Sequence, residues 1–84
     1  MFEILLSCVA AKELDKLKNP IHDRIHRMLE RLQNWPNVSG AKALAGDLAG
    51  SFRMRTGAYR LQFHLENQAI VIDKIGHRDG FYDD

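Results

Sequence analysis

The chain has 84 residues, of which 45% are hydrophobic and 27% are charged. This length allows one compact domain over residues 1–84, and the composition is that of a folded chain, not a disordered one. The formal net charge is only +1, so bulk charge does not indicate nucleic-acid binding and any basic site must be local. The single cysteine, Cys8, excludes an intramolecular disulfide, and no cysteine and histidine spacing indicates a structural zinc site.

The apolar stretch at residues 4–11 could be mistaken for a targeting segment. It is too short to span a bilayer, and no basic segment precedes it. We therefore expect a cytoplasmic protein that does not interact with membranes.

The first half of the chain predicts a strand followed by two helices. Residues 2–6 are typical of a short apolar strand, and Ser7 is a plausible N-cap for a helix that ends near Lys18. The apolar stripe of this helix consists of Ala10, Leu14 and Leu17. The two helices are predicted to form an antiparallel hairpin.

The second helix is the strongest helix prediction in the chain. Asn19 is expected to cap it and Pro20 to occupy its first position. It should end by Asn34, because Pro36 disfavours helical geometry at the residue before it. Its apolar stripe consists of Ile21, Ile25, Met28, Leu29 and Leu32.

The second half changes to strand periodicity after a loop over residues 37–50. Within that loop Ala43, Leu44 and Leu48 are expected to anchor on the core. Alternating or β-branched runs then predict three antiparallel strands, separated by turns at Thr56-Gly57 and at 66–68; the runs are 52–55, 59–65 and 69–75. The predicted fold class is α+β, with an N-terminal strand and a helical hairpin packed on an antiparallel sheet.

Arginines gather on the sheet face that points away from the core. A tight loop at Thr56-Gly57 would place Arg53 opposite Arg60, Met54 opposite Tyr59 and Phe52 opposite Leu61. Arg53, Arg55 and Arg60 then share one face. Like charges held opposite each other cost stability, so a fold that keeps them there is expected to bind an anion. Lys42 upstream and Arg78 downstream favour the same reading.

An alternative explanation of this face remains open. Arginine is common on a solvated sheet face, and a second turn that brings Asp73 close to Arg60 would produce an ordinary salt bridge.

The histidines allow separate interpretations. His22 and His26 have the spacing of a metal pair but no third ligand, which favours a solvated helix face. His64 alternates onto the Arg60 face, where it is either simply exposed or contacts a phosphate. His77 directly precedes Arg78 and lies close to Tyr82 in sequence, a cluster that could supply a titratable group, a cation and a phenol. The alternative is a C-terminal tail that only packs over the sheet edge.

An ordered set of short motifs resembles the RelE/ParE toxin superfamily along nearly the whole chain. The matching segments are Lys42-x-Leu44, Leu48-Ala49-Gly50, Ser51-Phe52-Arg53-Met54-Arg55, Gly57-Ala58-Tyr59-Arg60-Leu61, Ile75-Gly76-His77-Arg78 and Phe81-Tyr82. The resemblance implies a toxin of a type II toxin–antitoxin pair. RelE-like members cut messenger RNA on the ribosome by metal-independent attack of the ribose 2′-oxygen on the adjacent phosphate, whereas ParE-like members poison DNA gyrase.

The resemblance also implies roles for individual residues. Arg60 and Arg78 would clamp the scissile phosphate, and Arg53 and Arg55 would stabilise developing charge. Tyr82 would stack on a base or assist proton transfer, and His77 is an acid/base candidate. Lys42 and His64 are expected to bind RNA. No cofactor or metal is expected.

The C-terminus departs from the pattern of many relatives. Asp79, Asp83 and Asp84 stand beside the implied phosphate site and would repel RNA. Three readings therefore stay open: a ribosome-dependent mRNA endonuclease, a ParE-like gyrase inhibitor, or an inactive relative that serves as an antitoxin-binding module. In each case the implied partner is a cognate antitoxin that wraps the chain and contacts operator DNA with its own domain; ribosome and mRNA are partners in the first reading only.

Overall fold

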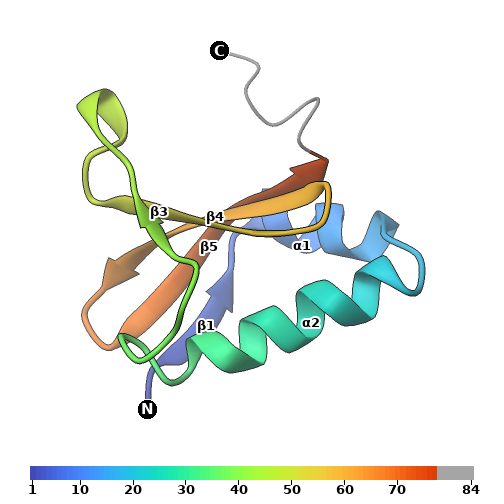
Figure 1. Cartoon of the computed structure of the whole chain (residues 1–84), viewed down its shortest axis with the longest axis horizontal. Coiled ribbons are helices and arrows are strands. Elements are labelled where there is room, and N and C mark those ends of the chain that lie inside the picture. Colours follow the sequence, from blue (N-terminus) through green and yellow to red (C-terminus); the bar gives the residue numbers. More distant parts are fainter. Residues whose placement is uncertain (78–84) are drawn as a thin grey trace.

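The computed structural model describes residues 1–77, so the predictions for Arg78 and Tyr82, and for the three C-terminal aspartates, lie outside the described residues. Along the chain the elements are β1 (Glu3–Leu6), α1 (Cys8–Lys16), α2 (Ile21–Leu32), β2 (Lys42–Ala43), a 3-10 turn (Gly46–Leu48), β3 (Ser51–Thr56), β4 (Tyr59–Glu66) and β5 (Ala69–His77). The strands form one sheet in the order β1-β5-β4-β3-β2, and both helices lie on the same face of it (Figure 1). We call the opposite face the outer face.

The sheet is mixed. β5, β4, β3 and β2 pair antiparallel in succession, as the alternating runs predict, whereas β1 pairs parallel with β5. The parallel pairing is possible because both helices follow β1 in the sequence and precede the other strands. No tight turn therefore joins β1 to β5 and imposes an antiparallel arrangement. The α+β class and the helical layer on the sheet are confirmed.

The helices begin and end close to the predicted positions, with one correction. Oγ of Ser7 accepts a hydrogen bond from the amide of Ala10 at 3.0 Å, which confirms it as the N-cap of α1. The predicted cap of α2 by Asn19 is wrong, because Pro20 occupies the N-cap position and no side chain caps the helix. The His22 amide instead donates to the carbonyl oxygen of Lys18 at 3.1 Å, which satisfies a first-turn donor through the backbone.

The segment before β3 is less loop-like than predicted and is anchored differently. Val38 and Ala41 pack against the core, and Leu44 is half-buried. Ala43 and Leu48 are exposed, so their predicted role as anchors is wrong. The reason is position, since β2 is the edge strand of the sheet and Leu48 belongs to the 3-10 turn.

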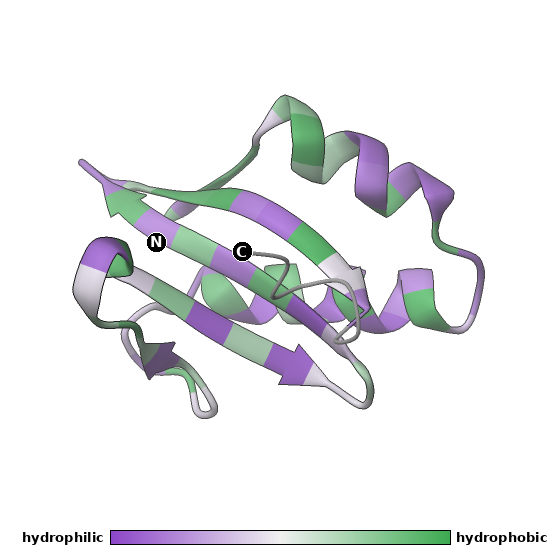
Figure 2. Ribbon diagram, turned by 90° about the horizontal axis from the view of Figure 1, so that it is seen from above, coloured by the Kyte–Doolittle hydropathy of each residue, from purple (hydrophilic) through white to green (hydrophobic). Residues whose placement is uncertain are grey.

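The core lies between the helices and the inner face of the sheet. Alternation of apolar and polar residues along the strands separates this face from the outer one (Figure 2). The ring of Trp35 packs edge-on against Phe52 and Phe63, with centroid distances of 4.9 and 5.4 Å, which agrees with a structural role for the tryptophan. The buried residues are Ala10, Leu14, Ile25, Met28, Leu29, Leu32, Met54, Leu61, Phe63, Ile70, Ile72 and Ile75.

The predicted register between β3 and β4 is wrong by two residues. Thr56 remains in the strand and pairs with Tyr59, so the tight loop consists of Gly57 and Ala58. Gly57 has a φ of 59°, a conformation that glycine adopts without steric cost. A shift of two residues keeps every side chain on its predicted face but changes its partner. Arg60 therefore lies opposite Arg55 and not opposite Arg53.

Candidate functional site

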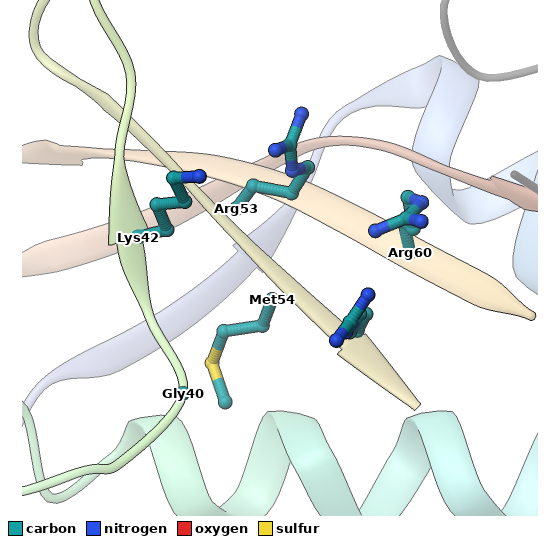
Figure 3. Close-up of a pocket in the computed structure, with 6 residues that line it drawn as sticks. Gly40, Lys42, Arg53, Met54 and Arg60 are labelled. Carbon is teal, nitrogen blue, oxygen red and sulfur yellow. The ribbon is translucent and has the colours of Figure 1, made fainter. Parts of the chain in front are cut away.

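Four basic side chains converge on the outer face. Arg53 and Arg55 come from β3, Arg60 comes from β4, and Lys42 joins them because β2 pairs Lys42 with Arg53. Figure 3 shows Lys42, Arg53 and Arg60 on the side of the sheet away from Met54, whose side chain points toward the helical layer. Together with Gly40, these residues line a cavity of about 450 Å³, which we call the outer-face cavity.

The cavity is suited to an anion. Arg55 and Arg60 are direct cross-strand partners, and like charges at this position destabilise a sheet by about 0.2–1 kcal/mol. On its other side Arg60 lies opposite Gly76, so no side chain of β5 stands across from it. Guanidinium groups can each donate two parallel hydrogen bonds to phosphate oxygens and remain charged at any relevant pH. The arrangement could therefore bind and polarise a phosphate.

His64 lies farther along β4 on the outer face, inside a carboxylate cluster. Its Nδ1 is 2.9 Å from Oδ2 of Asp73, and its Nε2 is 3.1 Å from Oε2 of Glu66. The hydrogen bond with Asp73, and then that with Glu66, raises the pKa of His64 above its ordinary value. Because a carboxylate oxygen accepts and does not donate, both ring nitrogens are protonated when both contacts form.

Asp73, the residue that the salt-bridge alternative paired with Arg60, belongs to this cluster. Asp73 is the extra residue of a β-bulge, since Ile72 pairs with Phe63 and Lys74 already pairs with Gln62. Its carboxylate contacts the ring of His64. The outer face thus has a cationic end at the outer-face cavity and an end bordered by carboxylates at the β4–β5 turn.

The structure brings together only some of the predicted site residues. Lys42, Arg53, Arg55 and Arg60 share the outer-face cavity, whereas His64 lies outside it. His77, the last described residue, pairs with Tyr59, and the alternation along β4 puts that pair on the face opposite to Arg60.

The α2 histidines gain no further ligand. The rings of His22 and His26 stack with centroids 6.3 Å apart. Within residues 1–77, no group of three or more histidine, cysteine or acidic side chains could hold a metal ion. No helix of this part of the chain is long and apolar enough to cross a membrane.

A second basic cavity was not anticipated from the sequence. Arg24, Arg27 and Arg31 of α2, together with Met28, Arg55 and Thr56, line a space of about 290 Å³, which we call the helix-side cavity. The signal was present as a spacing of three and four residues along α2, which places the three arginines on one helix face. The spacing does not reveal that this helix face lies beside Arg55 of β3, because that contact depends on how the helix packs on the sheet.

Comparisons with known proteins agree with the architecture. No family model matches the chain. Toxin RelE3 from Methanocaldococcus jannaschii is 25% identical over 84 residues, which cover 96% of each chain. The toxin–antitoxin complex RelBE2 from Mycobacterium tuberculosis contains a chain with a TM-score of 0.78 and 25% identity, covering 92% of this chain and 98% of that one.

Two further solved structures show the same fold. A chain of the RelB–RelE antitoxin–toxin complex from Methanococcus jannaschii has a TM-score of 0.79 and 26% identity, covering 94% of this chain and 95% of that one. The isolated E. coli RelE toxin has a TM-score of 0.78 at 15% identity, covering 92% and 84%. In its helical hairpin, its mixed sheet and its sequence, the chain is therefore similar to RelE toxins of the RelE/ParE superfamily.

Proposed function

We propose that the protein is the toxin of a type II toxin–antitoxin pair and acts in the cytoplasm as a ribosome-dependent mRNA endonuclease. The observation that carries this proposal is the outer-face cavity, where Arg55 and Arg60 are held directly opposite each other beside Arg53 and Lys42. Like charges held opposite each other cost folding stability, and a bound anion would offset that cost. The relatives named as RelE toxins support the assignment of that anion to RNA.

The proposed reaction needs no group beyond the RNA and the protein. The ribose 2′-oxygen attacks the adjacent phosphorus, its proton passes to an acceptor, and the bond to the 5′-oxygen of the next nucleotide breaks. The leaving oxygen takes up a proton, so the products are a cyclic phosphate and a 5′-hydroxyl end. Negative charge on the phosphate oxygens rises in the transition state, and fixed guanidinium groups lower the barrier by stabilising that charge.

Most of the predicted site residues have a role in this proposal. Arg60 and Arg78 clamp the scissile phosphate, and Arg53 and Arg55 stabilise the developing charge. Tyr82 stacks on a base or assists proton transfer. His77, predicted as an acid/base candidate, receives no role at the phosphate, because its pair with Tyr59 lies on the face opposite to Arg60. Lys42 supports RNA binding from the neighbouring strand. His64, predicted from the sequence to bind RNA, receives no such role here, because it lies outside the cavity and both its ring nitrogens contact the carboxylates of Asp73 and Glu66.

The proposed partner is a cognate antitoxin. Several of the related structures are toxin–antitoxin complexes, including RelBE2 from Mycobacterium tuberculosis and RelB–RelE from Methanococcus jannaschii. An antitoxin that covers the outer face would neutralise its charge and stabilise the folded toxin by mass action. Contact with operator DNA would be made by the antitoxin.

Induced expression in cells tests the proposal. Transcript 5′ ends on translating ribosomes are mapped for the wild type, for Arg60→Ala/Arg78→Ala, and for Lys12→Ala/Lys18→Ala as a control with the same change in charge. New cuts at A-site positions should appear in the wild type and the control and be absent from the first variant. Retained co-purification of that variant with the antitoxin shows that it folds.

The remaining outcomes separate the rival functions. Growth arrest with DNA damage signalling and without cuts would replace the proposal with gyrase inhibition. No arrest, with tight antitoxin binding retained, would replace it with an inactive antitoxin-binding module, the reading motivated by Asp79, Asp83 and Asp84.

A further inference from the structure

The outer-face cavity and the helix-side cavity meet at one residue. Arg55 lines the outer-face cavity and also the helix-side cavity, at the end of β3. The N-terminal part of α2 lies beneath the β3–β4 hairpin (Figure 1), and a methyl group placed at Gly57 would come 3.9 Å from Nη1 of Arg24. The cationic surface of the sheet therefore continues around the β3–β4 hairpin onto α2.

The arginines of α2 are not explained by the fold. Arg24, Arg27 and Arg31 lie on one helix face at spacings where like charges repel, and all three are exposed. Within residues 1–77, Arg24, Arg27 and Arg55 form no salt bridge with an acidic side chain, and no acidic side chain lines either cavity. Arg31 alone has a backbone contact, a donated hydrogen bond of 3.3 Å to the carbonyl oxygen of Ser39.

We propose that Arg24, Arg27 and Arg31, joined to the outer-face cavity through Arg55, form a second RNA-binding surface that holds the phosphate backbone flanking the bound segment. The inference rests on the proposed function of the outer face as an RNA site. It assigns a direction to the RNA: the backbone leaves the outer face past Arg55 onto α2. The opposite direction leads to the carboxylates of Glu66 and Asp73, which repel a polyanion.

Two observations favour RNA over an acidic polypeptide as the ligand. The charges form a chain across two elements, which matches a polymer with one negative charge per nucleotide. Within residues 1–77, the exposed large apolar side chains lie elsewhere, and none of them lines the helix-side cavity; they are Met1, Leu5, Leu6, Val9, Leu48 and Leu65. A protein interface is usually centred on apolar side chains, whereas phosphate binding needs only the cations.

The test measures binding and not cleavage. The probe is a fluorescently labelled 2′-O-methyl oligoribonucleotide of about 12 nucleotides, whose blocked 2′-oxygen cannot attack, and its affinity is measured by anisotropy over a range of salt concentrations. Arg24→Gln/Arg27→Gln is compared with Lys12→Gln/Lys16→Gln, which removes the same charge from exposed positions of α1 outside both cavities. Glutamine is a good helix former, so both variants should retain the fold.

The expected effect follows from counterion release. Loss of two phosphate contacts on a single strand should lower the slope of log affinity against log salt by about 1.4. If the affinities converge near ~1 M salt, this corresponds to about 25-fold weaker binding at ~0.1 M. The α1 control should keep the wild-type slope. A probe of about three nucleotides, too short to reach from one cavity to the other, should be insensitive to the α2 substitutions.

Three results would overturn the inference. The slopes of the α2 variant and the control could be equal; the short probe could be as sensitive as the long one; or polyglutamate of matched charge could displace the RNA as well as unlabelled RNA does. Failure of the proposed nuclease is distinguishable, because it abolishes cuts in cells without altering the salt dependence of binding to the inert probe.

Discussion

Replacing Arg55 by glutamine should make the protein more stable and a poorer RNA binder. Arg55 is exposed, so its truncation removes little packing, and it lies directly opposite Arg60 on β4. Relief of this like-charge pair is worth about 0.2–1 kcal/mol. For a domain of this size, that corresponds to a rise in melting temperature of about 1–8 °C. RNA affinity should fall, because Arg55 lines both basic cavities.

Thermal unfolding at two salt concentrations provides the assay. At ~1 M salt the Debye length is only about 3 Å, so the gain in stability should largely disappear. Lys18→Gln is the matched control, since Lys18 is exposed, carries the same charge and lines neither cavity. A gain of the same size in the control, a gain that persists unchanged at high salt, or a loss of stability at low salt would refute the electrostatic argument.

Three further predictions concern the fold. Ser7→Ala should lower the free energy of unfolding by about 1–2 kcal/mol in urea titrations, because Oγ of Ser7 both caps α1 and donates to the carbonyl oxygen of Asp73 at 2.9 Å. Phe63→Ala should cost about 3–5 kcal/mol, since Phe63 is fully buried, and Trp35 fluorescence should report the altered packing; a loss below 1 kcal/mol would contradict this picture of the core. Because folding raises the pKa of His64, the resulting stabilisation should be fully present below the unfolded value near 6.5 and be lost as pH rises through the higher folded pKa. His64→Gln should flatten that part of the profile of melting temperature against pH, and an unchanged profile would rule out the cluster as its source.

The hydrophobic pattern predicted the elements and the faces of the sheet from local sequence. The helical stripe from Ile21 to Leu32, the Ser7 cap and the alternation that sends Arg53, Arg55 and Arg60 to one face all depend on residues close together in the chain. These features follow from the 3.6-residue and two-residue periods of helix and strand, which neighbours in sequence are sufficient to reveal.

The partners of these residues were decided by the tertiary structure. Glycine at position 57 begins the tight loop, which moves Arg60 from Arg53 to Arg55, and a bulge turns Asp73 toward His64. In the same way, Arg55 meets the arginines of α2 only because the hairpin packs over that helix. Alternation specifies the face on which a side chain lies, but the residue across from it depends on turn geometry, bulges and the orientation of helices on the sheet. Those contacts join residues distant in sequence, and no local period encodes them.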